Sequence, residues 1–123
     1  MVTISDYIKN ITKKILDSIY IIENLDNDLD SLEILKIELK HINGFILIII
    51  RKLESRDKIS ELHSALLTKS KDYLDSNYFF RELQQINDIY SNDQNRIKNI
   101  RKLIVDSFYQ KKFFDVLNEL QNN

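Results

Sequence analysis

The sequence contains no cysteine, no proline and no tryptophan, and only one of its 123 residues is glycine. Without cysteine the chain can form neither a disulfide bond nor a thiolate metal site. Proline and glycine interrupt helices and build the tight turns of hairpins, so their scarcity disfavours a β-sheet and favours long helices. With 30% charged residues, the composition predicts an all-α fold, an antiparallel bundle of four to five helices in one domain spanning residues 1–123.

The chain also lacks a large surplus of positive or negative residues, because its net charge is −1 at pH 7. The chain therefore has no overall attraction to nucleic acid or to an anionic membrane. A single glycine cannot supply a glycine-rich phosphate loop, and no serine lies in the glycine-flanked turn of a hydrolase nucleophile. Residues 1–10 are polar and amphipathic and lack the apolar core of a signal peptide. We expect a cytoplasmic protein that is not an enzyme and requires no cofactor.

The longest apolar run is FILIII at residues 45–50, directly after the only glycine. It is far shorter than the ~20 apolar residues of a membrane-spanning helix, so no membrane span is predicted. The run lies on a seam with alternating spacings of three and four residues that continues through Gly44, which predicts one helix over about 31–54. The seam consists of Leu32, Leu35, Leu39, Ile42, Ile46, Ile49 and Leu53.

A second apolar stripe on the same helix begins at Ile34 and Ile37 and continues through Phe45 and Ile48. The helix is therefore apolar on nearly every side, and such a helix needs to be buried on every side. It is predicted to be the central helix of the bundle, or to have one face in contact with another molecule. Gly44 either admits a neighbouring helix or has no packing role.

Polar breaks and apolar stripes divide the rest of the chain into further helices. The first is predicted to start near Thr3 or Ser5, which are both good N-caps. The next after the long helix is predicted to start near Ser55 or Asp57, and a following helix carries the apolar residues of 79–90. The stripe of the last helix changes register near its end, which predicts a bend or a separate short helix.

Two patterns have the residue types of a metal site. Asp26, Asp28 and Asp30 resemble the start of a calcium-binding loop, but the sixth position of that loop is not glycine and the twelfth is not glutamate. These acids are better explained as the start of the long helix. Glu38 and His41 have the Glu-x-x-His spacing of di-iron bundles, which require a second such pair and two further glutamates. We therefore predict no metal site.

Two groups of residues support an alternative function in RNA binding or cleavage. In their spacing, Arg56 and His63 resemble the arginine and the histidine of small helical ribonucleases of the HEPN class. Lys98, Arg101 and Lys102 share one face of the last helix, where they could contact phosphates. A solvated helix surface explains the same residues, so nucleic acid is the less favoured partner. The candidate nucleic-acid residues are Arg96, Lys98, Arg101 and Lys102.

The stretch ISELHSALLTKSKDYLDSNYF at residues 59–79 resembles the small bacteriocin immunity proteins of low-GC Gram-positive bacteria. The resemblance rests on an Ile-Ser-Glu start, a Leu-Leu pair, a Lys-Asp pair and an aromatic residue after a polar turn. Phe108 and Tyr109 are similar to an aromatic pair in the family's last helix. The chain is longer at its N-terminus than the family and lacks its short C-terminal tail. The resemblance implies a four-helix cytosolic protein that protects a producer cell at the toxin's membrane receptor, with recognition by the late helix and C-terminus.

We therefore predict a non-catalytic protein-binding module, such as an inhibitor, an adaptor or an immunity-type protein, that acts through an apolar and aromatic helical surface. Phe113 and Phe114 are adjacent and cannot both face one core, which makes them the best candidates for exposed aromatic residues. A self-assembling protein, for example a homodimer that pairs the 31–54 helix across a two-fold axis, is a further alternative. The predicted partner-binding residues are Phe45, Ile48, Phe108, Tyr109, Phe113 and Phe114.

Overall fold

The computed structural model describes residues 3–26, 29–75, 94–110 and 112–122. These residues form five α-helices and no strand, which confirms the predicted all-α helical bundle. The helix predicted over residues 79–90 lies outside the described residues. The helices are α1 (Ile4–Glu23), α2 (Leu29–Glu54), α3 (Glu61–Asp75), α5 (Gln94–Gln110) and α6 (Phe113–Gln121).

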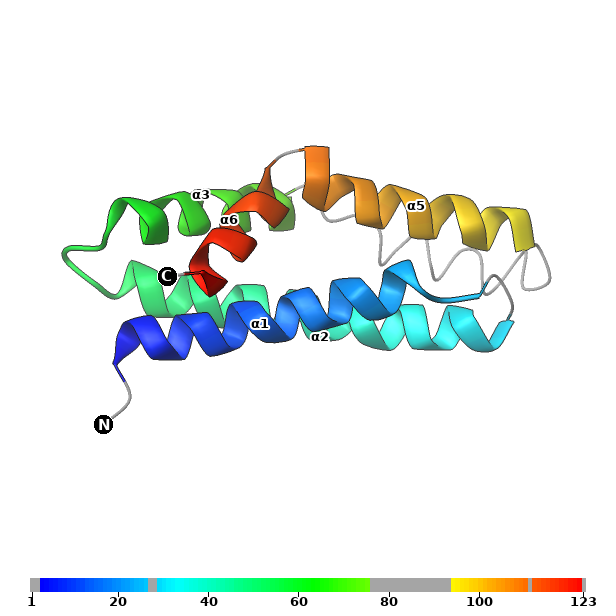
Figure 1. The fold of residues 1–123 in the computed structure, drawn as a ribbon, viewed down its shortest axis with the longest axis horizontal. Helices are drawn as coiled ribbons and strands as arrows, with labels where there is room; N and C mark the ends of the chain where they lie inside the picture. Colours follow the sequence, from blue (N-terminus) through cyan, green and yellow to red (C-terminus); the bar gives the residue numbers. More distant parts are fainter. Residues whose placement is uncertain (1–2, 27–28, 76–93, 111, 123) are drawn as a thin grey trace.

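The helices are arranged in two layers (Figure 1). α1 and α2 run antiparallel side by side and form one layer, while α3, α6 and α5 form the other. α1 packs against α2, α5 and α6, whereas α2 packs mainly against α1 and α3. None of the helices in the described ranges covers the outer side of the α1–α2 layer. In the same ranges, no helix is long and apolar enough to cross a membrane.

The core lies between the two layers, and each helix contributes one stripe to it. The predicted seam of α2 is buried along its described length, from Leu35 to Leu53, and the isoleucines of α1 from Ile8 to Ile22 pack against it. An aromatic cluster closes the opposite layer: the ring centroid of Tyr73 lies 4.9 Å from that of Phe108 and 5.8 Å from that of Phe113. Leu66, Ile100, Ile104, Leu117 and Leu120 complete this side of the core.

Of the two alternatives predicted for α2, the one that places it at the centre of the bundle and buries it on every side is wrong. Its seam is buried, but Ile34, Ile37 and Leu47 are exposed, and Phe45 and Ile48 are half-buried. The reason is the layered arrangement. Among the described residues, α2 has neighbours toward α1 and toward α3 but no helix on its outer side, where the second apolar stripe lies.

The observed helix starts follow their caps. Thr3 caps α1 as predicted, because its Oγ1 accepts a hydrogen bond of 3.1 Å from the backbone N–H of Asp6. α3 starts later than the predicted Ser55 or Asp57, since Ser60 Oγ accepts the N–H of His63 at 3.1 Å.

The register change in the last predicted helix corresponds to a break between two helices. Lys112 has a positive φ of 59° between the end of α5 and the start of α6. α6 then folds back onto α1, where Gln121 Nε2 donates to the Lys9 carbonyl at 2.8 Å and to Thr12 Oγ1 at 2.7 Å. These bonds also satisfy the hydroxyl of Thr12, which is fully buried. The separate short helix is therefore confirmed.

Candidate protein-binding surfaces

Two of the six predicted partner-binding residues belong to the core, and their prediction as contact residues is wrong for this fold. Phe108 is 0% exposed and Phe113 is 1% exposed. Their ring centroids lie 5.6 Å apart, and both contact Tyr73 of α3. Phe113 occupies the first turn of α6, so its ring joins the end of α5 to α3 rather than facing a partner.

Tyr109 and Phe114 lie outside this cluster. Tyr109 is exposed and Phe114 is half-buried, and their ring centroids are 4.5 Å apart. The Tyr109 hydroxyl donates a hydrogen bond of 2.6 Å to Glu23 Oε1. This bond, together with partial burial and the negative charge of Glu23, raises the pKa of Tyr109 to about 12. Tyr109 therefore connects α5 to α1 and is still 44% exposed.

The remaining two predicted residues, Phe45 and Ile48, line one shallow groove on the outer side of α2. We call it the α2 groove; its volume is about 520 Å³. Gly44 lies at its middle, and a Cβ added there would meet no atom within 4 Å. The glycine therefore opens the floor of the groove instead of admitting a neighbouring helix. The groove is lined by Ile37, Lys40, His41, Gly44, Phe45 and Ile48.

α1 extends this surface along one edge. Lys14 Nζ of α1 lies 5.8 Å from the ring centroid of Phe45, and Lys52 Nζ of α2 lies 5.2 Å from that of Tyr7. These two contacts show which side of α1 borders the second stripe of α2, and Ile21 follows Lys14 at helical spacing on that side. We define the outer face as Tyr7, Lys14, Ile21, Ile34, Ile37, His41, Phe45 and Ile48, of which Tyr7, Ile21, Ile34 and Ile37 are exposed hydrophobic residues.

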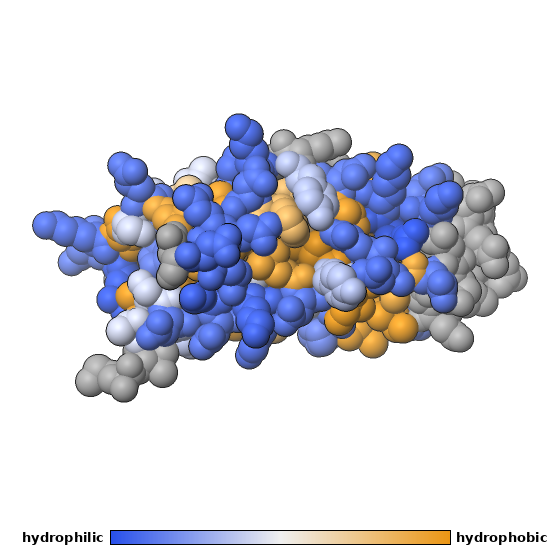
Figure 2. Space-filling view, viewed as in Figure 1, coloured by the Kyte–Doolittle hydropathy of each residue, from blue (hydrophilic) through white to orange (hydrophobic). Residues whose placement is uncertain are grey.

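Apolar side chains also reach the surface elsewhere, so exposure alone does not define a site. Figure 2 shows one side of the molecule, on which hydrophobic groups appear among hydrophilic ones, with a cluster near the end of α1 and the start of α2. Leu103 of α5 is 52% exposed, as much as Ile37. The difference is that Ile37 belongs to a stripe at helical spacing and lines a groove. Leu103 lines neither of the two grooves found among the described residues.

The side chains of the Glu-x-x-His pair of α2, Glu38 and His41, lie close together. His41 Nδ1 lies 3.7 Å from Glu38 Oε2, an interaction that requires a protonated histidine. The described residues contain no group of three or more His, Cys, Asp or Glu side chains that could hold a metal ion. Of the three acids that resemble the start of a calcium-binding loop, Asp26 is exposed, Asp28 lies outside the described residues, and the Asp30 side chain is not described.

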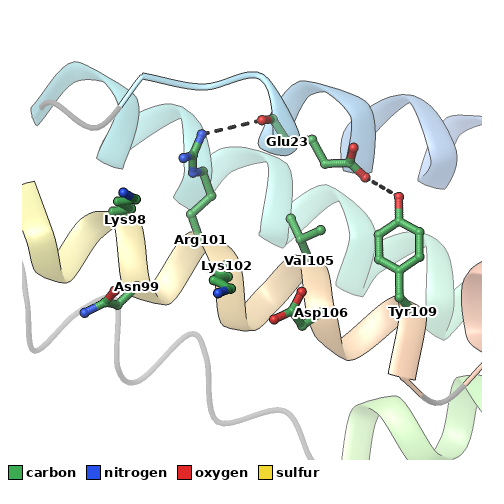
Figure 3. Close-up of a pocket in the computed structure, with 8 residues that line it drawn as sticks. All are labelled: Glu23, Lys98, Asn99, Arg101, Lys102, Val105, Asp106 and Tyr109. Atoms are coloured by element: carbon green, nitrogen blue, oxygen red, sulfur yellow. Dashed lines mark hydrogen bonds between the residues drawn. The ribbon is translucent and has the colours of Figure 1, made fainter.

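A second groove, the α5 groove, lies between α5 and the end of α1 (Figure 3), and its volume is also about 520 Å³. It brings together three of the four predicted nucleic-acid residues, Lys98, Arg101 and Lys102, while the side chain of Arg96 is not described. Two carboxylates share the groove, so its charge is mixed. Its lining residues are Glu23, Lys98, Asn99, Arg101, Lys102, Val105, Asp106 and Tyr109.

Arg101, one of the residues that could contact phosphates, is engaged within the fold. Its Nη1 donates to the backbone carbonyl of Glu23 at 3.5 Å (Figure 3) and also to that of Leu25. α1 has no basic residue in its own last turn. Arg101 therefore supplies from α5 the positive charge and the donors that the end of a helix requires. Lys98 and Lys102 remain exposed in the groove.

Replacing Arg101 by alanine should lower the free energy of unfolding by about 1 kcal/mol, because the terminal carbonyls of α1 lose a charged donor. Urea unfolding followed by circular dichroism measures the change. Lys102→Ala is the matched control: its side chain is exposed, and we expect a change within about 0.5 kcal/mol. Equal effects of the two substitutions would contradict the capping role of Arg101.

Arg56 and His63 occupy different environments. Arg56 is exposed in the connection between α2 and α3, whereas His63 is 8% exposed in the first turn of α3. With only 8% of its surface exposed, His63 is poorly placed to contact an RNA backbone, which weakens the ribonuclease alternative. Burial disfavours the charged imidazole and lowers the pKa of His63.

This lowered pKa predicts a loss of stability at acidic pH. The unfolded chain binds a proton at His63 near pH ~6.5, whereas the folded chain binds it only at lower pH, so stability falls as pH drops through this range. The midpoint of thermal unfolding should therefore fall between about pH 7.5 and about pH 5.5, and His63→Leu should reduce the fall. His41→Gln replaces the exposed histidine instead and is the matched control, in which the fall should persist. An unchanged fall in His63→Leu would contradict the assignment.

Comparison of the chain with known protein families, with curated proteins and with solved structures finds no match. The geometry of the two grooves is therefore the basis on which a function can be argued.

Proposed function

We propose that this protein is a non-catalytic protein-binding module that contacts its partner through the outer face of α1 and α2. The observation that carries the proposal is the second apolar stripe of α2, which no described helix covers. Single exposed apolar residues are common on soluble proteins. A continuous stripe around a groove is less common, and it is the usual sign of an interaction site.

Phe45 is the side chain best suited to anchor a partner. Its ring is half-buried, with Lys14 on the α1 side and the ring of His41 at 6.3 Å. Its position is therefore largely fixed before binding, which lowers the entropic cost of contact. Aromatic residues held in this way at the centre of a contact surface contribute much of the binding energy in many complexes.

An inhibitor, an adaptor and an immunity-type protein all fit this proposal. The resemblance to bacteriocin immunity proteins supports the last of these, and its residues 59–75 fall on α3 and the connection before it. Recognition by the late helix would then use Tyr109 and Phe114, since the ring of Phe108 is buried. We favour the outer face of α1 and α2 because it is the longer uncovered apolar surface among the described residues.

The test uses a photo-reactive amino acid placed at Ile37 and, as a matched control, at Leu103, since both residues are 52% exposed. Each variant is produced in the native cell, irradiated and analysed by mass spectrometry. We expect one specific protein adduct from position 37, none from position 103, and loss of the adduct when Phe45→Ala is added. Adducts of equal yield from both positions would contradict the proposal. An adduct with a second copy would favour self-assembly, and one with RNA would favour the α5 groove.

A further inference from the structure

We infer that the occupant of the α2 groove is an amphipathic helix of another protein, with acidic residues along both edges of its apolar stripe. This inference names the partner chemistry of the proposed function and rests on it. Three features of the groove carry it: the spacing of its lining residues, the charge of its edges and the chemistry of its floor.

The spacing of the lining residues favours a helix as the occupant. Ile37, His41, Phe45 and Ile48 follow one another at intervals of four, four and three residues, so the groove runs for about three turns along α2. A helix that lies along this line can place its own side chains at the same intervals between them. The open position at Gly44 leaves room for one large apolar side chain at the middle of the contact.

Both edges of the groove are cationic. Phe45 marks the edge toward α1, because Lys14 of α1 lies over its ring. Lys40 precedes Phe45 by five residues, which is about 140° around the helix axis, so it lies on the opposite edge. Lys14 and Lys40 are exposed, and neither takes part in an ion pair within the described part of the chain. Two cations on opposite edges match a partner helix with an acid on each flank.

The lining of the groove supplies no compensating acid. None of its six residues, all of which the structure describes, is Asp or Glu. The nearby Glu38 lies outside this lining, and only 14% of its side chain is exposed. A second copy of the chain is therefore a poor occupant, since a two-fold axis would bring the same lysines of both copies to one interface. Like charges that meet across an interface are costly and select against the wrong partner.

The test compares two synthetic helical peptides of about 20 residues, roughly 30 Å long. They share one leucine stripe and differ only in its flanks, which are glutamate in one peptide and lysine in the other. Fluorescence anisotropy measures the binding of each labelled peptide to the full chain. We expect the glutamate peptide to bind at least tenfold more tightly, roughly the sum of a few exposed charge pairs, and the difference to shrink as salt is raised.

Charge-reversal variants test which groove causes the preference for the glutamate peptide. Lys14→Glu combined with Lys40→Glu should abolish the preference for the glutamate peptide, whereas Lys98→Glu combined with Lys102→Glu in the α5 groove should leave it intact. Ile37→Gln should weaken both peptides, and Leu103→Gln should weaken neither. Retention of the preference in the Lys14 and Lys40 variant would overturn the inference.

The other outcomes separate this inference from the proposed function. Equal binding of the two peptides, still weakened by Ile37→Gln, overturns the acidic partner but leaves a protein-binding face. Binding of neither peptide, with an adduct still formed from position 37, overturns the helical partner alone. Tighter binding to phosphatidylserine vesicles than to the glutamate peptide overturns the inference in favour of a membrane surface. A dimer in sedimentation that Ile37→Gln dissociates overturns it in favour of a second copy.

Discussion

Phe113→Ala is expected to lower the free energy of unfolding by about 3–5 kcal/mol, whereas Phe114→Ala, one residue later, should cost about 1–2 kcal/mol. Phe113 is 1% exposed and contacts two other aromatic rings, so its loss leaves a cavity that the neighbouring helices cannot easily fill. Phe114 is half-buried, packs against the edge of the core and has the ring of Tyr109 as a neighbour at 4.5 Å between centroids. Natural domains of this size have a total stability of only ~5–15 kcal/mol, so the first variant should be close to unfolding.

Urea unfolding at equilibrium, followed by far-ultraviolet circular dichroism, measures both variants. The adjacent positions make a matched pair, because they share one helix turn, one residue type and the same substitution. Similar losses from the two variants would contradict the placement of Phe113 in the core and Phe114 at its edge. A larger loss from Phe114→Ala would reverse that placement.

Ile46→Asp should abolish cooperative folding, because it places a carboxylate on the buried seam of α2. Ile46 is 0% exposed, and burial of an unpaired charge costs several kcal/mol even after the surroundings relax. The buried carboxylate would lie on α2, which packs against both α1 and α3, so the two layers should separate.

The control for Ile46→Asp lies on the same helix. Ile37 belongs to the outer stripe, and Ile37→Asp should change the free energy of unfolding by no more than about 0.5 kcal/mol, apart from a small change in helix propensity. Thermal unfolding and proton NMR spectra distinguish a folded chain from an unfolded one. A folded Ile46→Asp, or an unfolded Ile37→Asp, would contradict the assignment of the two stripes to inside and outside.

Hydrophobic spacing in the sequence was enough to predict the helical class, the seam of α2 and the break before α6. It also predicts that Ile34, Ile37, Phe45 and Ile48 share a side of α2. It cannot predict whether another helix covers that side, because this depends on how many helices meet α2 and where. The inference from an apolar circumference to a central position failed for this reason.

The aromatic residues show the same limit on a smaller scale. The adjacency of Phe113 and Phe114 predicts that one ring leaves the core, but not which one. The choice depends on the left-handed turn at Lys112, which sets the direction in which α6 begins. Arg101 is a further example. The spacing of basic residues cannot tell a solvated cation from one that caps α1, although the absence of a basic residue in the last turn of α1 is a signal that such a cap is needed.

The contact between Gln121 and α1 has a consequence for the order of folding. Gln121 lies 112 positions after Lys9 and 109 positions after Thr12 in the sequence, whereas α1 and α2 are neighbours in sequence. Local pairs form quickly, and contacts that close long loops form slowly, because the loop entropy is lost before the contact is gained. The α1–α2 hairpin should therefore form first, and the part of α1 that α6 covers stays exposed to solvent until α6 docks. During this interval the chain is most prone to aggregation, and α6 is the segment whose arrival ends it.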